Sequence, residues 1–248
     1  MNLSNMPLCW ICNSKPANSG EHIIQDRDIK RSFSIKPGDP LFIRTSTIKN
    51  LKVQSCRSNR LKFSKVICEN CNTTLTQPHD LDWQKLSEFL NDNSFSAGKK
   101  LRFNRVFPYN TRRSMYNVQL HFVKKLGCAI VEDNIPIDIS SFSEALLENK
   151  CHPNVYIGFT DRLLEEGKNY IEISDIQYWH SNDVVSCMIW SFSFEKFTVV
   201  MMYAAEGESR TGQSILWNPR SNPNCISIFD VNDLINKDKD KEDIIIRH

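Results

Sequence analysis

Four cysteines stand in two Cys-x-x-Cys pairs, Cys9 with Cys12 and Cys68 with Cys71. Two thiolates at this spacing can bind one tetrahedral Zn²⁺, with Zn–S bonds of about 2.3 Å. The 55 residues between the pairs exceed the usual separation in a zinc ribbon. That both pairs bind the same ion is therefore a prediction that the spacing alone does not establish. Two unrelated thiol pairs and a redox-active Cys-x-x-Cys are the alternatives. The redox alternative is disfavoured because no strand-helix-strand pattern surrounds either pair.

Polar residues of catalytic type lie beside the cysteine pairs. Glu21-His22 follows the first pair, and Asn72 and then His79-Asp80 follow the second. An imidazole with an unperturbed pKa of about 6.5 can take a proton from water at neutral pH. Oxygen ligands with one imidazole suit Mg²⁺ or Mn²⁺, and such a cation can stabilise the charge that develops on a phosphate. Hydrolysis of a phosphodiester bond, which needs a deprotonated water and a cation, is one reaction that these residue types could serve.

The ordered set of motifs resembles the zinc-stabilised form of the HNH endonuclease family, over residues 9 to about 90. The resemblance implies a ββα-metal fold, in which an acid-His pair ends one strand and the helix after the hairpin supplies further ligands. It also implies DNA as the substrate, a structural Zn²⁺ and a catalytic Mg²⁺ or Mn²⁺. The motifs that carry it are Cys9-x2-Cys12, Glu21-His22-Ile23-Ile24, Cys68-x2-Cys71-Asn72 and the downstream His79.

The same resemblance assigns a role to each polar residue. His22 would be the general base, and Glu21 would bind the divalent cation. Asn72 would order the loop or touch the metal, and His79 would be the ligand from the helix. Pro78 cannot donate a helical hydrogen bond and would interrupt a helix running on from Asn72, so Asp80 is the alternative ligand.

Positive charge is concentrated in the first half of the chain. Residues 1–113 contain 19 Lys and Arg against 9 Asp and Glu, whereas residues 114–248 contain 12 against 20. Residues 40–68 contain seven cations and no acid, within an insertion that separates the motifs. We predict that this segment binds the phosphate backbone of DNA, with a solvated charged surface as the alternative. The cations are Arg44, Lys49, Lys52, Arg57, Arg60, Lys62 and Lys65.

Hydrophobic periodicity predicts the elements that must position these groups. The pattern predicts an α+β fold: an HNH-like zinc domain over residues 1–95, an α+β accessory domain with an antiparallel sheet over 100–236, and a charged tail over 237–248. Predicted strands cover 41–48, 61–67, 155–159, 170–179, 184–194 and 197–205, and predicted helices cover 78–91, 116–131 and 142–148.

Composition limits the class of protein. The hydrophobic share of 40% and the charged share of 24% are those of a globular chain. Glu195 and Lys196 divide the most apolar stretch, so no membrane span is expected. The first residues lack the pattern of a secretory signal, and we expect a cytoplasmic protein whose nine cysteines are thiols or metal ligands.

Two functions from different classes fit these features. The first is a metal-dependent HNH endonuclease that cuts DNA, with anti-phage defence as a role suggested by analogy alone. The second is a non-catalytic zinc module that binds nucleic acid. The acidic segment 100–236 favours a protein partner or a sensor subunit over DNA as its own contact. A protein that retains an HNH-like unit only for interactions is the remaining alternative.

Overall fold

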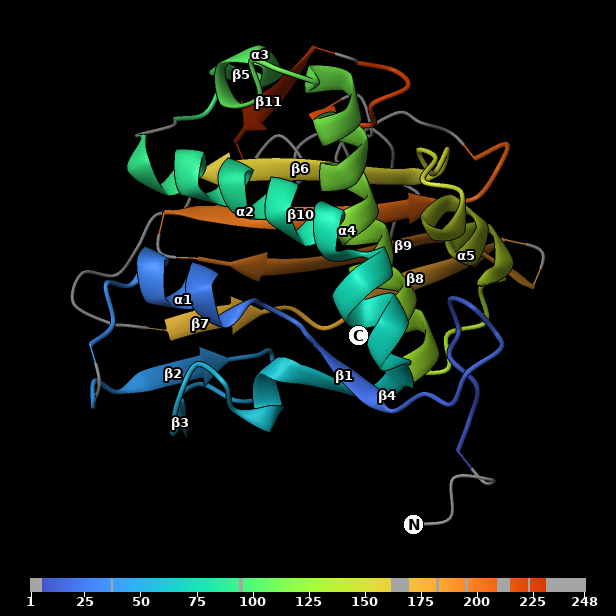
Figure 1. Ribbon diagram of the computed structural model, residues 1–248. Helices are drawn as coiled ribbons and strands as arrows, with labels where there is room; N and C mark the ends of the chain where they lie inside the picture. Colours follow the sequence, from blue (N-terminus) through green and yellow to red (C-terminus); the bar gives the residue numbers. More distant parts are fainter. Residues whose placement is uncertain are drawn as a thin grey trace.

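A large mixed sheet forms the centre of the molecule (Figure 1). The computed structural model describes residues 6–36, 38–93, 96–161, 170–181, 183–194, 196–208, 215–222 and 224–230; the tail predicted over 237–248 lies outside them. The strands of this sheet are β2 (Leu41–Arg44), β3 (Leu51–Val53), β5 (Lys100–Arg102), β6 (Val155–Asp161), β7 (Tyr170–Ile173), β8 (Gln177–Ser181), β9 (Val184–Ser193), β10 (Phe197–Ala204) and β11 (Cys225–Phe229).

The strands run in the order β3-β2-β7-β9-β10-β6-β11-β5, and β8 also pairs with β9. Most neighbours are antiparallel, which agrees with the predicted sheet, but β11 is parallel to β6 and β2 is parallel to β7. The segment predicted as one strand over 170–179 forms two, β7 and β8. The fold is therefore α+β with a mixed sheet.

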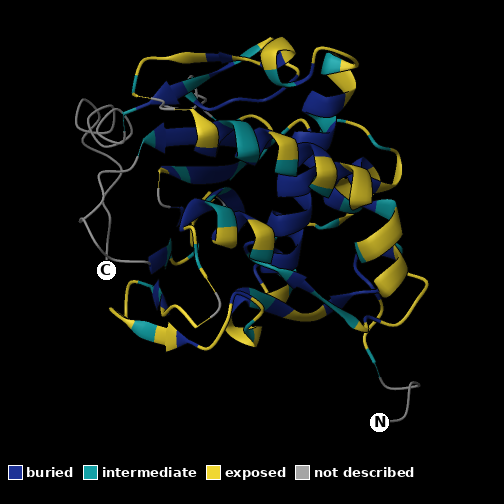
Figure 2. Cartoon of the chain, turned by 60° about the vertical axis from the view of Figure 1, so that its left-hand side comes forward, coloured by how far each residue is buried: buried dark blue, intermediate teal, exposed yellow. Residues whose placement is uncertain are grey.

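Helices cover one face of this sheet. The helices are α1 (Asp26–Ser32), α2 (Gln77–Asp92), α3 (Phe103–Val106), α4 (Thr111–Glu132) and α5 (Ser140–Leu147), with a short 3-10 turn η2 (Asn59–Leu61). Trp83 of α2 stacks on Phe159 of β6 with ring centroids 6.2 Å apart and meets Phe122 of α4 edge-on at 4.7 Å. Helix α4 is almost entirely buried along its length (Figure 2). No helix in the described part of the chain has the length and apolarity needed to cross a bilayer.

A separate two-stranded sheet carries Glu21 and His22. Strands β1 (Ser19–His22) and β4 (Lys62–Ile67) pair antiparallel. A side chain at Gly20 would place its Cβ only 2.9 Å from the carbonyl oxygen of Phe63, so a residue without a side chain allows the strands to approach. After β4 the chain forms one π-helical turn, η3 (Cys71–Leu75), and breaks at Thr76 before α2 begins. Pro78 lies in the first turn of α2, the position predicted for it.

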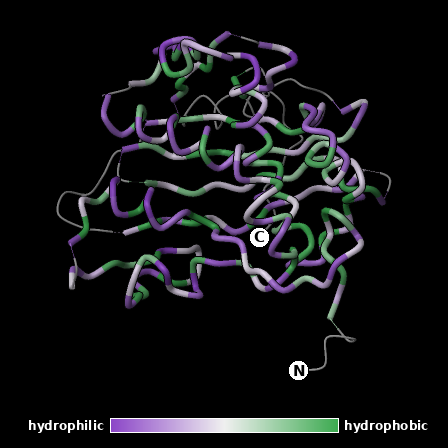
Figure 3. The backbone as a smooth tube through the Cα atoms, viewed as in Figure 1, coloured by the Kyte–Doolittle hydropathy of each residue, from purple (hydrophilic) through white to green (hydrophobic). Residues whose placement is uncertain are grey.

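The two predicted domains share one sheet and one core. Strands β2 and β3, from the first segment, extend the sheet formed by residues 100–230. One hydrophobic cluster includes residues from Cys9 to Ile228. Hydrophobic residues recur along the strands and helices of the fold (Figure 3). The boundary between 95 and 100 stays a prediction, but the basic insertion is in part a structural element of the large sheet.

Three buried histidines make the fold sensitive to acid. Burial lowers the pKa of His79, His121 and His152 to about 4. His152 has no exposed surface; its Nδ1 accepts a hydrogen bond from the Asn154 amide at 3.1 Å, and its Nε2 lies 3.1 Å from Ser141 Oγ. In the unfolded chain a histidine titrates near 6.5, so between pH 6.5 and 4 the unfolded state binds more protons.

We therefore expect the free energy of unfolding to fall as pH decreases from 6.5 to 4. His152 alone should account for about 3 kcal/mol of that loss, on the basis of roughly 1.4 kcal/mol for each pKa unit. Denaturant titrations at several pH values should show a shallower pH dependence for His152→Gln than for wild type. The matched control is His180→Gln, since the His180 side chain is exposed. An unchanged pH dependence in His152→Gln would contradict this assignment.

Candidate functional site

The four cysteines of the two pairs come together in space. Their sulfur atoms all lie within 4.8 Å of one another, and the Sγ atoms of Cys12 and Cys68 are 3.9 Å apart. A tetrahedral ion with bonds of about 2.3 Å places its sulfur ligands about 3.8 Å apart, whereas a disulfide requires about 2.05 Å. All four are free thiols. The structure thus confirms that the pairs meet, and the site has the donors and spacing to hold a metal such as zinc.

Local backbone structure positions these sulfur atoms. Cys9 begins a tight turn in which the Asn13 amide donates to the Cys9 carbonyl at 2.8 Å, with Asn13 in the left-handed region at φ 46°. Cys68 follows β4, and the Cys71 amide lies 3.5 Å from the Cys68 sulfur. Burial and the neighbouring thiols raise the pKa of Cys71. A bound divalent cation would remove this cost of ionising several adjacent thiols.

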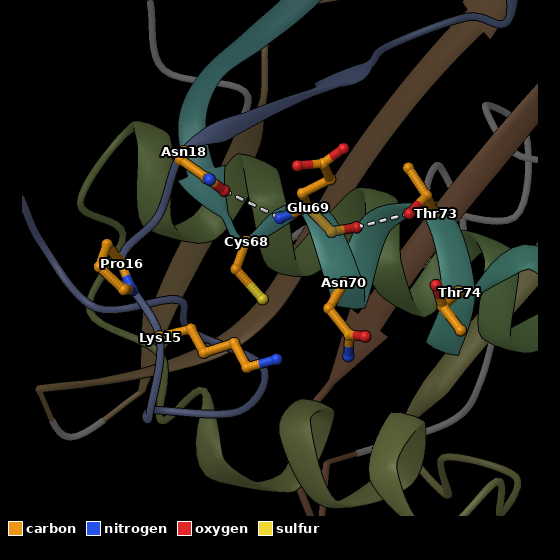
Figure 4. A pocket seen from close by; sticks show the side chains of 8 residues that line it. All are labelled: Lys15, Pro16, Asn18, Cys68, Glu69, Asn70, Thr73 and Thr74. Carbon is orange, nitrogen blue, oxygen red and sulfur yellow. Dashed lines mark hydrogen bonds between the residues drawn. The ribbon is translucent and has the colours of Figure 1, made fainter.

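The cysteine cluster is packed against α4. The ring of Trp10, between Cys9 and Cys12, lies on Gly127, where an added Cβ would be 2.3 Å from a ring carbon. A glycine at this point of the helix therefore lets the indole reach the helix backbone. On its outer side the cluster adjoins an open pocket of about 460 Å³, where Lys15 and Asn18 face the turn that carries Cys68 (Figure 4). The Asn18 side chain accepts from the Glu69 amide at 2.9 Å and fixes the start of that turn.

A second pocket, of about 410 Å³, contains three of the four predicted catalytic residues, Glu21, His22 and Asn72. It lies between the end of β1, the start of α1 and the first turn of α2. It is lined by Gly20, Glu21, His22, Gln25, Asp26, Arg27, Asn72, Thr73, Gln77, Asp80, Leu81 and Gln84. We call it the His22 pocket. Asn72 is fixed in its wall because its side-chain amide donates to Ser19 Oγ at 2.9 Å.

The imidazole of His22 is neutral at physiological pH. Burial lowers its pKa, and the nearby charges of Lys125 and Lys62 lower it further. The side chain is partly exposed, but its Nε2 has almost no solvent-accessible surface and no hydrogen-bond partner among the described residues. A neutral imidazole that lines an open pocket can accept a proton.

Glu21 and Asp80 are both paired with buried lysines of α4. Lys124 Nζ lies 3.2 Å from Glu21 Oε2 and 2.8 Å from Asp80 Oδ2, and Lys125 Nζ donates to Glu21 Oε1 and to the His22 carbonyl. His121 Nδ1 lies 2.7 Å from Asp80 Oδ1. Burial opposes ionisation of both acids, but the adjacent ammonium groups lower their pKa values. Both acids are therefore ionised, Glu21 in a buried position and Asp80 at the partly exposed edge of the pocket.

His79 is not part of the His22 pocket. It is fully buried, and its Nε2 lies 3.0 Å from Asn149 Oδ1, in the segment after α5. The next residue, Asp80, turns to the pocket instead, which is the alternative left open because of Pro78. Within the described residues, the four cysteines are the one group of three or more His, Cys, Asp or Glu side chains close enough to share a metal ion.

The basic residues of the insertion separate into two sets. Arg44 lies over the ring of Tyr170 at 4.2 Å, and Lys49 and Lys52 are exposed on the β2–β3 hairpin. The second set, near the His22 pocket and β4, consists of Arg57, Arg60, Lys62 and Lys65. Arg57 Nε donates to Asp26, a residue of the pocket wall, at 3.1 Å.

Sequence reasoning missed the contribution of α4. Lys124 and Lys125 lie 103 and 104 residues after Glu21, the acid that both contact, and periodicity predicts no more than a helix over residues 116–131. Two adjacent lysines within a helix of otherwise buried residues were the available signal, because such charges need buried partners. Arg27, which lines the pocket, belongs to none of the motifs found in the sequence.

Comparison with protein-family models, with curated proteins and with solved structures finds no match to this chain. The resemblance to HNH endonucleases therefore rests on the sequence motifs alone.

Proposed function

We propose that this chain hydrolyses phosphodiester bonds of nucleic acid, with the His22 pocket as its active site. The observation that carries the proposal is the neutral imidazole of His22 in the wall of an open pocket shared with Asn72 and Asp80. The antiparallel pairing of β1 with β4, followed along the chain by α2, supports the proposal.

In this proposal His22 removes a proton from the water that attacks phosphorus, and the bond from phosphorus to one ester oxygen breaks, releasing that oxygen as an alcohol that takes up a proton. The depressed pKa keeps the ring unprotonated at neutral pH, as a general base requires. Arg27 lines the same pocket, and Lys62 lies close enough to affect the pKa of His22. These two cations are suited to bind the phosphate and to stabilise its developing charge.

The cysteine cluster has a structural role in this scheme. Cys68 and Cys71 bracket the turn that leads to Asn72, and Cys9 and Cys12 precede β1. A zinc ion bound to all four would hold the β1–β4 sheet against that turn. It would thereby keep His22 and Asn72 on one pocket wall.

The donors predicted for a catalytic Mg²⁺ or Mn²⁺ do not fit one. Glu21 has both of its oxygens paired with ammonium groups, and His79 is bound to Asn149 outside the pocket. Asp80, the alternative ligand, is paired with Lys124 and His121. The proposed reaction is therefore derived without a step that uses such an ion.

A nucleic-acid-binding module without catalysis is the second candidate, favoured by the basic residues beside β4. One experiment separates the two functions. Purified zinc-loaded protein is incubated with supercoiled DNA, single-stranded DNA and RNA, with added Mg²⁺, added Mn²⁺ or neither. Cleavage of any substrate by wild type and not by His22→Ala supports the hydrolase. Retention of nucleic acid without cleavage under all conditions would support the binding module and reject the hydrolase.

The basic set beside the pocket should control the salt dependence of binding. Replacing Arg57, Arg60 and Lys62 by glutamine should reduce the slope of log K against log salt by about 2 to 3 for duplex DNA, since each phosphate contact contributes about 0.9. Binding isotherms at several salt concentrations measure this slope. The matched control replaces Lys100, Arg102 and Arg105, which are exposed near the β5 end of the sheet. Equal slopes in both triple variants would identify the first set as an ordinary solvated surface.

A further inference from the structure

The ammonium of Lys124 is surrounded by oxygen atoms as a bound cation would be. Its side chain has no exposed surface. Nζ lies 2.8 and 2.9 Å from the two oxygens of Asp80, 3.2 Å from Glu21 Oε2 and 3.2 Å from Thr76 Oγ1. Two carboxylates, from β1 and α2, and a hydroxyl from the break before α2 thus converge on one positive charge.

The charges of this network already balance. Glu21 and Asp80 contribute two negative charges, and Lys124 and Lys125 contribute two positive charges. His121 is neutral at pH 7 because burial lowers its pKa to about 4. Every carboxylate oxygen of the two acids has at least one donor: Lys125 at Glu21 Oε1, Lys124 at Oε2 and at both oxygens of Asp80. No uncompensated negative charge remains to attract a divalent ion.

We propose that the Lys124 ammonium permanently occupies the place between Glu21 and Asp80 that a divalent cation would need, so that the His22 pocket works without Mg²⁺ or Mn²⁺. Such an ion would bind carboxylate oxygens at about 2.0 to 2.6 Å and would lie directly against the ammonium. Lys125 extends the arrangement, because its bond to the His22 carbonyl ties the end of β1 to α4. The second half of this inference, catalysis without the divalent ion, rests on the proposed function.

The assignment of Lys124 can be tested by cation binding. Full-length protein preloaded with zinc is titrated with Mn²⁺, and free Mn²⁺ is measured by electron paramagnetic resonance. Wild type should bind no stoichiometric Mn²⁺. Lys124→Ala leaves the two acids without their shared cation and should bind one equivalent, on the order of tenfold or more tighter than wild type. The double variant Lys124→Ala/Asp80→Asn should lose this binding.

Thermal melting provides a second measurement. Lys124→Ala should melt at a lower temperature than wild type, and Mn²⁺ should raise the melting temperature of this variant but not of wild type. The control is Lys150→Ala, which removes the exposed ammonium beside Glu148 and should respond to Mn²⁺ as wild type does. A folded Lys124→Ala protein that binds Mn²⁺ no better than wild type would overturn the assignment.

If Lys124→Ala does not fold, Mn²⁺ binding by the wild-type protein tests the role of Lys124. Stoichiometric Mn²⁺ binding by wild type that disappears in Asp80→Asn would overturn the inference, and its absence supports it. Cleavage assays then separate the inference from the proposed function. Cleavage that requires added Mg²⁺ rejects the inference while the hydrolase stands. Absence of cleavage in every buffer, together with absence of Mn²⁺ binding, rejects the hydrolase while the role of Lys124 stands.

Discussion

Replacing His22 by alanine is expected to reduce nucleic-acid cleavage by about 10² to 10⁴-fold, the usual contribution of a general base. The fold should tolerate the change, because Nε2 has no hydrogen-bond partner among the described residues and no buried group loses a bond to it. Zinc content and melting temperature should therefore stay close to those of wild type. Cleavage rates on a labelled substrate, measured beside elemental analysis and a melting curve, give all three quantities.

The pH profile of wild type gives the same assignment a second test. A base must be unprotonated, and burial together with Lys125 and Lys62 lowers the pKa of His22 below its ordinary value of about 6.5. The rate should be constant near neutral pH and should fall as pH decreases through the lowered pKa. His180→Ala, which removes an exposed imidazole on β8, is the matched control and should retain activity. Full activity in His22→Ala would remove this residue from the mechanism.

Replacing Cys68 by serine is expected to destabilise the protein strongly. Three remaining thiols bind zinc far more weakly than four, and binding of a structural zinc is coupled to folding. A loss of several kcal/mol corresponds to a decrease of about 10 °C or more in melting temperature, at about 2 to 4 °C for each kcal/mol in a chain of this size. Differential scanning fluorimetry measures the change in melting temperature. The zinc content, measured by elemental analysis, should fall below one ion per chain.

Cys225→Ser provides the comparison for the cysteine cluster. Cys225 is partly exposed on β11 and lies outside the group of four, so its replacement should change the stability by no more than about 0.5 kcal/mol. Removing the metal from wild type with a chelator should reproduce the effect of Cys68→Ser. Wild-type protein that contains no zinc and melts at the same temperature as Cys68→Ser would contradict the structural role of the cluster.

Local patterns predicted much of this structure. The predicted helix over 78–91 is α2, the helix over 116–131 lies within α4, and strands β6, β9 and β10 lie where alternation and β-branched residues indicated. The meeting of the two cysteine pairs was also predicted correctly, because tetrahedral metal chemistry constrains residues that are distant in the sequence. These features depend either on a short stretch of sequence or on the geometry that a metal ion imposes on its ligands.

Long-range pairing could not be predicted in this way. Strand β1 has four residues, and strand β3 has three, too few for periodicity to be visible. Strand β2 pairs with β7, which lies more than a hundred residues later in the chain, so no local pattern predicts this pairing. Glu21 appeared to be a metal ligand because its buried partners, Lys124 and Lys125, are supplied by another part of the chain. Charge balance at a buried site is a property of the assembled fold and not of a motif.

The shared sheet limits how the motif unit can be reused. Residues 1–95 contain every recognisable motif, yet α4 supplies the counter-charges of Glu21 and Asp80, and Gly127 of α4 receives the Trp10 ring. A gene fragment that encodes only the motifs would leave two acids unneutralised and the β2–β3 hairpin without its neighbour β7. Transferring residues 1–95 into another protein would therefore require that α4 be transferred as well. Chimeras that exchange one of these two segments without the other should fold poorly.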